Sequence, residues 1–348
     1  MITDTTTKLA HNKDLSYDEM RDTMNDILNG KSSVQETSNF LKNLTTKGES
    51  DDELLAMLDA MQEYSIHIEP KCNGRLIDVC GTGGDKMHTF NVSTTAAFVI
   101  AAGGVNVAKH GNRSTSGISG SADIFEYFGY NLYMEPKKIK EIIEKFHIGF
   151  MFAQKFHPAM KNVADARKAL GIRTAFNLLG PLSNPALVKN QLVGVFSPSY
   201  LQRIITLLQS RGAENVMTVI SDDGLDELST TSKNKVYHLK DNKVSNFVLD
   251  PSELGLTKTN LREIQISTKN EAIRAFISVL DHTGKKSMID VTALNAAAGF
   301  IVGGVANRFD EALDMAFDTI HSGKPFDLFR DFIKHCGDIS KLEELKNN

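Results

Sequence analysis

The sequence predicts an α/β protein, with a small N-terminal helical domain plus a larger domain that has a mainly parallel sheet flanked by helices. Three observations predict this fold class. From about residue 75, short apolar runs with β-branched residues alternate with helical segments, which is the pattern of βαβ units. Residues 15–69 show only helical periodicity. Glycines follow the first predicted strand, as in the ligand-binding turns of open α/β sheets.

The composition is that of an ordinary globular protein, with 348 residues, 41% hydrophobic and 24% charged. A formal net charge of −4 argues against a general nucleic-acid binder. We expect no membrane partner and a cytoplasmic location, because the start of the chain lacks an apolar signal segment and no apolar run reaches the roughly 20 residues that span a bilayer. Cys72, Cys80 and Cys336 have no CxxC spacing, so the sequence predicts neither a disulfide framework nor a zinc site.

The N-terminal part of the chain predicts three amphipathic helices after a loose end at residues 1–14. The helices are expected at residues 16–30, 33–48 and 51–65. Each has an apolar stripe with i, i+3/i+4 spacing, which in the first helix consists of Met20, Met24, Ile27 and Leu28. A layer of three helices cannot bury all these stripes, so we expect it to pack on the rest of the chain or on a second copy.

A glycine-rich turn follows the first predicted strand, Arg75–Cys80. The turn consists of Gly81, Thr82, Gly83 and Gly84. Glycines allow a positive φ and let consecutive N–H groups approach a ligand, so the turn predicts a phosphate-binding loop. It is neither a dinucleotide fingerprint, because Lys86 stands where the third glycine belongs, nor a P-loop.

A helix start and a second strand complete the predicted βαβ unit. Asn91, Ser93 and Thr94 precede the apolar segment 96–102, and the free N–H groups of such a helix start favour an anion. The next strand is expected from Ala102 to Lys109. In a βαβ unit, the segments 81–85, 91–94 and 109–113 should meet at one edge of the sheet, where open α/β sheets bind ligands.

The remaining chain continues the alternation of helices and strands. Helices are expected to end at Tyr130 and to cover 136–146, 158–170 and a segment after Pro198, with strands at 148–153, 191–196 and 215–220. Residues 176–185 are expected to be irregular because they contain prolines and asparagines. Strands at 235–240 and 243–249, separated by Asp241 and Asn242, predict a hairpin, and helices follow at 270–280, 291–304 and 310–323. The tail, 331–348, is given no prediction.

The motifs together resemble the anthranilate phosphoribosyltransferases, which join anthranilate to phosphoribosyl pyrophosphate (PRPP) in tryptophan synthesis. The resemblance lies in residues 78–123, 152–160, 171–185, 191–198 and 223–229, and it extends to about residue 322. It implies a fold like that of nucleoside phosphorylases and phosphoribosyltransferases. Residues 1–73, joined by part of 160–190, would form the helical domain and 74–348 the phosphoribosyl-transfer domain. It also implies a homodimer through the N-terminal helices.

The resemblance assigns residues to both substrates and to Mg²⁺. The PRPP site would be lined by Gly81, Thr82, Gly83, Gly84, Asp85, Thr89, Asn91, Val92, Ser93, Thr94, Lys109 and Ser121. The anthranilate site would be formed by Gly81, His110, Asn112, His157, Arg167, Gly180 and Pro181. Mg²⁺ would be held by Ser93, Asp226 and Glu227. No residue is predicted as a nucleophile or strong acid, because ribosyl transfer from PRPP needs placement and charge neutralisation in an oxocarbenium-like transition state.

The acidic turn gives a physical argument for the metal. Asp222, Asp223, Asp226 and Glu227 follow a predicted strand and repel one another unless a cation lies among them. Mg²⁺ binds one or two carboxylates together with substrate oxygens, which fits a site beside pyrophosphate. The resemblance assigns the metal to Asp226 and Glu227 rather than to the other two acids. The alternative is a solvated acidic turn.

Other assigned residues also have simpler interpretations. Thr94 could be only a helix cap, Lys109 a solvated surface lysine, Arg167 an exposed helix arginine, and His157 a core histidine. The chain departs from the family pattern at two places: Asp165 and Ala166 replace proline and valine, and Ile220 and Ser221 replace His-Gly. At the second place a polar contact to the following loop is expected to be missing.

Three other functions fit these motifs less well. A pyrimidine nucleoside phosphorylase shares the architecture, but the acids of DGLDE (223–227) favour chemistry with Mg²⁺ and pyrophosphate. A type I phosphoribosyltransferase would need a DDxxxTGG signature, which the sequence lacks. An inactive relative that binds nucleic acid is disfavoured by the net acidity and by the complete set of motif residues.

Overall fold

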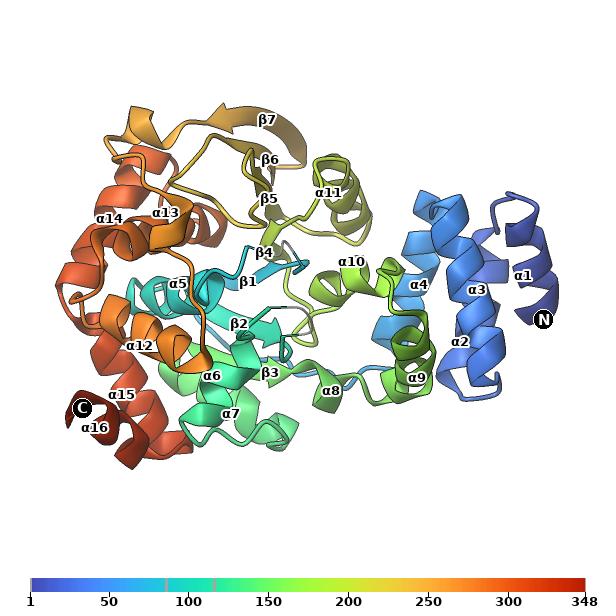
Figure 1. The fold of residues 1–348 in the computed structure, drawn as a ribbon, viewed down its shortest axis with the longest axis horizontal. Coiled ribbons are helices and arrows are strands. Elements are labelled where there is room, and N and C mark those ends of the chain that lie inside the picture. Colours follow the sequence, from blue (N-terminus) through green and yellow to red (C-terminus); the bar gives the residue numbers. More distant parts are fainter. Residues whose placement is uncertain (1, 85–86, 115–116, 348) are drawn as a thin grey trace. The chain divides into compact units, whose positions relative to one another are not determined.

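The computed structural model describes residues 2–84, 87–114 and 117–347, and it confirms the predicted fold class (Figure 1). The chain forms two compact units. The helical unit consists of Met1–His67 and Ala153–Leu187, and the α/β unit of Ile68–Phe152 and Val188–Asn348. No helix in the described residues combines the length and the apolar character that crossing a membrane requires.

The helical unit contains the three predicted helices, each starting with the same capping motif. Its elements are α1 (Ile2–Ala10), α2 (Tyr17–Leu28), α3 (Val34–Lys47), α4 (Asp51–Glu63), α8 (Ala153–Phe156), the 3₁₀ turn η1 (Pro158–Met160), α9 (Lys161–Leu170) and α10 (Ala175–Leu182). Ser16, Ser33 and Ser50 each accept a hydrogen bond from the N–H of a glutamate three residues later. The glutamate side chain accepts one in return, which fixes the first turn.

The apolar stripes of these helices are covered within the helical unit itself. Met20 and Met24 are fully buried, as is Phe40 of α3. Helix α1 packs on α3, α2 packs on α4, and α9 packs on α3. The stripes therefore pack on other parts of the chain, which is the first of the two expected alternatives, because α1, α9 and α10 add the missing layers.

Two expectations for this unit are wrong. Residues 2–10 are a helix, not a loose end, although its threonines are weak helix formers. Its residues Ile2, Thr5 and Leu9 are buried. Their tertiary packing outweighs the low helix propensity of the threonines. Helix α10 occupies a segment expected to be irregular. Pro181 lies one residue before the helix ends, so its missing N–H removes only one intrahelical bond, the one to the carbonyl of Asn177.

The α/β unit is built on a seven-stranded sheet in the order β3-β2-β1-β4-β5-β6-β7. The strands are β1 (Leu76–Gly81), β2 (Asn106–Gly111), β3 (Ile148–Phe152), β4 (Asn190–Gly194), β5 (Asn215–Ser221), β6 (Asn234–Lys240) and β7 (Lys243–Leu249). The first five are parallel, and β6 and β7 form the predicted antiparallel hairpin. Successive residues of β3, β4 and β5 are all buried, so both faces of the sheet are covered there.

Two helices of this unit, α15 (Lys324–Cys336) and α16 (Ile339–Asn347), were not predicted from the sequence. The elements are α5 (Val92–Ala102), α6 (Ser121–Tyr127), α7 (Pro136–Phe146), α11 (Tyr200–Ser210), η2 (Pro251–Leu254), η3 (Leu261–Glu263), α12 (Lys269–Leu280), α13 (Lys286–Gly303), α14 (Phe309–His321), α15 (Lys324–Cys336) and α16 (Ile339–Asn347). Helices α5 and α13 pack closely because Gly299 leaves room for Ile100. Phe329 and Phe332 of α15 stack edge-on against Phe98. The tail of the chain therefore begins inside the core.

Candidate active site

The glycine turn after β1 lies at the carboxyl edge of the sheet. Gly83 and Gly84 have φ values of 71° and 79°, which side chains rarely adopt, so the turn requires glycine there. The N–H of Thr82 donates to the carbonyl of Gly194 at the end of β4, at 2.9 Å. The Thr82 hydroxyl accepts a hydrogen bond from the N–H of Phe196 at 3.1 Å. These bonds tie the turn to the neighbouring strand. The assigned Asp85 lies outside the described residues.

Two of the four acids after β5 converge on this turn and on the start of α5. The Asp226 carboxylate accepts a hydrogen bond from the N–H of Gly83 at 2.6 Å. The Glu227 carboxylate accepts one from the N–H of Ser93 at 2.9 Å. These N–H groups are therefore presented to anionic oxygens. Asp226 is only 8% exposed, so the alternative of a solvated acidic turn is wrong for this residue.

The other two acids are used elsewhere. Asp222 is exposed and pairs with Lys235 at 3.4 Å. Asp223 accepts hydrogen bonds from the hydroxyls of Ser221, Ser229 and Thr231. Burial alone would raise the pKa of Asp223, but these bonds hold it below its ordinary value. Ser221 thus supplies a polar contact to the acidic loop, contrary to the expectation that the departure from His-Gly removes one.

Lys109 lies inside the site rather than on the surface. Its side chain is 2% exposed, and Nζ donates to the carbonyl of Val79 at 2.7 Å. Nζ also lies 3.4 Å from Oγ of Ser93. Burial lowers the pKa of Lys109, while the nearby Asp78 and Glu227 act in the opposite direction. The interpretation of Lys109 as a solvated lysine is therefore wrong.

Helix α5 starts with N–H groups that face the site. Asn91 is the N-cap, and Thr94 lies buried in the first turn, so Thr94 is not the cap. The Asn91 side chain makes no capping bond and instead donates to the carbonyl of Ser119 at 3.2 Å. Val92 is buried in the same turn. Nearby, Thr89 forms an isolated antiparallel bridge with Gln265.

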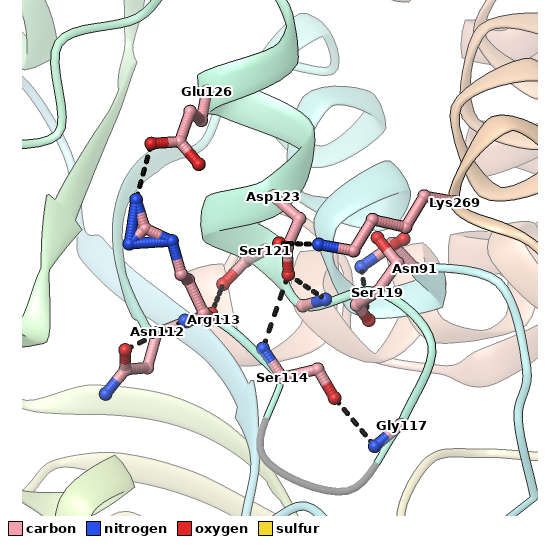
Figure 2. Close-up of polar contacts among 11 residues, drawn as sticks. Asn91, Asn112, Arg113, Ser114, Gly117, Ser119, Ser121, Asp123, Glu126 and Lys269 are labelled. Atoms are coloured by element: carbon pink, nitrogen blue, oxygen red, sulfur yellow. Dashed lines mark hydrogen bonds and ion pairs between the residues drawn. The ribbon is translucent and has the colours of Figure 1, made fainter.

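One carboxylate joins the two ends of the loop after β2, as Figure 2 shows. Asp123 of α6 accepts from the N–H groups of Gly120 at 2.8 Å and Ser114 at 3.3 Å, and from Lys269 at 2.7 Å. Burial opposes ionisation, yet these donors lower the pKa of Asp123. The Ser121 hydroxyl lies 3.4 Å from the carbonyl of Asn112. The ends of the loop are therefore fixed beside the assigned residues. Strand β2 extends to Gly111, two residues past the expected end.

The residues assigned to anthranilate are divided between the units. In the α/β unit, His110 is buried, and its main-chain N–H donates a hydrogen bond to the Asp78 carboxylate at 3.2 Å. Asn112 is exposed. In the helical unit, His157 is buried, which lowers its pKa to about 4 and keeps the imidazole neutral at physiological pH. Gly180 and Pro181 lie in α10 and are half-buried.

Arg167 of α9 is half-buried rather than exposed. Its guanidinium lies 5.6 Å from the centre of the Phe176 ring, and one nitrogen lies 3.4 Å from Oδ1 of Asn177. Burial lowers the pKa of Arg167, although an arginine remains charged. Among the described residues, no carboxylate forms an ion pair with it. A buried cation held only by a ring and an amide can accept an external carboxylate.

Sequence reasoning missed two residues of the carboxyl edge. Gly194 lies within the motif at residues 191–198, yet only the structure shows that a Cβ there would lie 1.5 Å from the carbonyl oxygen of Asp226. Asp78 is fully buried below the turn, within the first predicted strand. An acid in the middle of an apolar strand is the signal that could have identified it.

The fold and the site together define a glycosyltransferase. Residues 73–326 match the a/b domain of the glycosyl transferase family, and residues 3–65 match its helical bundle domain. The anthranilate phosphoribosyltransferase of Nitrosopumilus maritimus is 61% identical over 99% of this chain and 99% of that protein. That of Cenarchaeum symbiosum is 44% identical over 97% of this chain and 98% of that protein. The chain belongs to the anthranilate phosphoribosyltransferase family.

Solved structures agree with this relationship. The crystal structure of the Thermus thermophilus enzyme has a TM-score of 0.88 and 36% identity, covering 95% of this chain and 98% of that one. The Saccharomyces cerevisiae enzyme in complex with PRPP and Mg has a TM-score of 0.87 and 27% identity, with coverage of 96% and 97%. A structure of the same yeast enzyme with 4-fluoroanthranilate has a TM-score of 0.85 and 26% identity, again with coverage of 96% and 97%.

Proposed function

We propose that this protein transfers the phosphoribosyl group of PRPP to anthranilate, giving N-(5-phosphoribosyl)anthranilate and pyrophosphate, in tryptophan biosynthesis. One observation supports this most strongly: Asp226 and Glu227 converge on the N–H groups of Gly83 and Ser93, beside the buried Lys109. A site with anion-binding N–H groups, a cation and two carboxylates suits a metal-bound pyrophosphate. The yeast relative in complex with PRPP and Mg adds support.

The proposed roles in the PRPP site follow from charge. The N–H groups of the turn at 81–84 and of the α5 start that Asp226 and Glu227 do not occupy would bind phosphate oxygens, and Lys109 would neutralise part of their charge. Thr89, Asn91, Val92, Thr94, Ser121 and Asp85 complete the proposed set. As the bond between C1 and the pyrophosphate oxygen breaks, positive charge grows at C1 and negative charge grows on the leaving group. The anthranilate nitrogen then bonds to C1 and releases one proton. No covalent intermediate with the protein is needed.

The donor set of this edge fits Mg²⁺. Two carboxylates and the Ser93 hydroxyl are hard oxygen ligands, and their number leaves positions for substrate oxygens and water. Asp226, Glu227 and Ser93 would hold the cation. Bound there, Mg²⁺ would neutralise charge on the leaving pyrophosphate.

Anthranilate binding is proposed for residues of each unit. His110, Asn112 and Gly81 belong to the α/β unit, and His157, Arg167, Gly180 and Pro181 to the helical unit. Arg167 is the partner suited to the carboxylate, because a guanidinium binds carboxylates in a bidentate manner. The neutral His157 would contribute shape rather than charge.

Replacing Arg167 by alanine should raise the KM for anthranilate about 10- to 100-fold and leave the KM for PRPP nearly unchanged. The loss of a charge-assisted pair is worth roughly 1.5–3 kcal/mol. Steady-state kinetics with each substrate varied in turn would measure this. Lys168→Ala, an exposed neighbour on the same helix, is the matched control. An unchanged KM for anthranilate would remove Arg167 from the site.

The reaction itself can be followed by the fluorescence of anthranilate. We expect its loss only when purified protein, PRPP and Mg²⁺ are all present, with release of one pyrophosphate for each anthranilate consumed. Omission of PRPP, or chelation of the metal, should stop it. Phosphorolysis of a pyrimidine nucleoside at a comparable rate would instead favour a nucleoside phosphorylase.

A homodimer through the N-terminal helices rests on the family resemblance, since the helical stripes are already covered. The native protein should sediment at twice the chain mass, and Val34→Glu at the exposed start of α3 should give monomers. A native monomer at micromolar concentration would reject the dimer.

A cytoplasmic location agrees with the free thiols of Cys72, Cys80 and Cys336. The absence of nucleic-acid and membrane partners stays a prediction.

A further inference from the structure

A buried asparagine of α13 binds the peptide groups of the acidic loop directly after its two carboxylates. The side chain of Asn295 accepts a hydrogen bond from the N–H of Leu228 at 3.1 Å and donates one to the carbonyl of Leu228 at 2.8 Å. Its amide group also donates to the carbonyl of Val291 at 2.8 Å, one turn earlier in the same helix. Asn295 is 2% exposed, so these hydrogen bonds are buried.

A second buried asparagine repeats this arrangement on the next residue. Asn234, at the start of β6, accepts from the N–H of Ser229 at 2.7 Å and donates to the carbonyl of Ser229 at 2.9 Å. Asn234 and Ser229 are both completely buried. Two successive residues of the loop are thus each held at N–H and C=O by one asparagine side chain, in the manner of two short β-bridges.

The loop is also fixed on the other side of the carboxylates. The Ser221 hydroxyl accepts from the N–H of Leu225 at 2.9 Å, and the N–H of Ser221 donates to the carbonyl of Leu225 at 3.1 Å. The main chain is therefore anchored at residue 225 and again at 228–229. Only Asp226 and Glu227 lie between these anchors. Their carboxylates accept hydrogen bonds from the N–H groups of Gly83 and Ser93 in the proposed PRPP site.

Asparagine is the residue that this geometry requires. Its amide presents one acceptor and one donor group side by side, which matches the N–H and C=O of a peptide. Leucine of similar volume offers neither, and aspartate offers no donor. A buried peptide group that loses its partner cannot turn to water, so the loop would shift to satisfy it. A shift of the loop would move both carboxylates.

We propose that Asn295 and Asn234 are positioning residues for the divalent cation, holding Asp226 and Glu227 in register with Gly83 and Ser93. This inference rests on the proposed function, because it takes these two carboxylates as the metal ligands. Neither asparagine contacts substrate or metal in the proposal. Both act through the main chain of residues 228 and 229.

The test measures metal binding without turnover. Mn²⁺ is titrated into the full-length protein with saturating PRPP and no anthranilate, and free Mn²⁺ is followed by electron paramagnetic resonance. Asn295→Leu should weaken Mn²⁺ binding about 10- to 100-fold, the range found when supporting residues of metal ligands are removed. The KM for anthranilate should stay near the wild-type value.

A matched control separates positioning from stability. Asn215, at the start of β5, is fully buried and bonds the carbonyl of Ile301 in α13 at 3.1 Å, at the opposite end of the strand from the acidic loop. Asn215→Leu should lower the unfolding temperature by a similar amount and leave Mn²⁺ affinity within about twofold. Equal Mn²⁺ affinity of Asn295→Leu and wild type would overturn the inference alone. Absence of PRPP-dependent Mn²⁺ binding by the wild type would overturn the proposed function with it.

Hydrogen exchange keeps the inference testable if Asn295→Leu does not fold. In the wild-type protein, the amide hydrogens of Leu228 and Ser229 should exchange slowly, because each is bonded to a buried asparagine. If Asn295→Leu does fold, the amide of Leu228 in that variant should exchange faster than the amide of Ser229. Rapid exchange of both amides in the wild type would contradict the proposed anchoring.

Discussion

The double variant Asp226→Asn/Glu227→Gln is expected to lose at least about a hundredfold in kcat/KM and to need more Mg²⁺ for half-maximal rate. A hundredfold corresponds to about 2.7 kcal/mol of lost transition-state stabilisation. Both replacements keep a carbonyl oxygen that can accept from the N–H groups of Gly83 and Ser93. They remove only the two negative charges, so the unfolding temperature should stay near that of the wild type.

The neighbouring acids supply the control for this result. Asp222→Asn should leave rate and metal dependence nearly unchanged, because Asp222 is exposed and pairs with Lys235. Asp223→Asn should lower stability, since Asp223 organises three hydroxyls of the loop. If the double variant kept its rate and metal dependence while the Asp222 and Asp223 variants lost them, the metal would be assigned to the wrong pair.

Gly194→Ala is expected to abolish most activity and to destabilise the protein by more than about 1–3 kcal/mol, the usual cost of overpacking. A Cβ at this position would lie 1.5 Å from the carbonyl oxygen of Asp226 and 2.5 Å from its carbonyl carbon. These are main-chain atoms, so no side-chain rotation relieves the collision. The acidic loop must leave the carboxyl edge. Kinetics and thermal unfolding of the same preparation would measure both effects.

Gly149→Ala is the comparison variant for this glycine. Gly149 lies in β3 of the same sheet, and its added Cβ would meet a side-chain carbon of Ile143 at 2.5 Å. It should cost stability by overpacking but leave the KM values of both substrates close to those of the wild type. Normal kinetics of Gly194→Ala would show that the loop need not stay where the structure places it.

Local patterns predicted most of the α/β unit. The strand–glycine turn–helix–strand order gave β1, α5 and β2, because an apolar run that ends in glycines has few other structures available. Asp241 and Asn242 predicted the hairpin, and both adopt the positive φ that its two-residue turn demands. The convergence of Asp226 and Glu227 on the glycine turn also followed, since carboxyl ends of parallel strands share one edge.

The features that sequence did not predict depend on contacts between distant residues. Asn295 lies 67 residues from Leu228, and nothing near Asn295 distinguishes it from other small polar residues on α13. The burial of Lys109 also depends on strands and a helix that local patterns do not place around it. Helix α1 forms despite its threonines because Thr5 and Leu9 find partners in later helices. Helix propensity and hydrophobic periodicity depend on residues that are close in sequence, whereas these contacts form only between distant residues of the folded chain.

A crystal structure of the protein with PRPP and Mg²⁺ tests the central claim most directly. The account predicts pyrophosphate oxygens on the turn at 81–84 and at the start of α5, with Lys109 beside them. It also predicts a cation bound by carboxylate oxygens of Asp226 and Glu227. A cation on Asp222 and Asp223, or PRPP bound away from the carboxyl edge of β1, would contradict it.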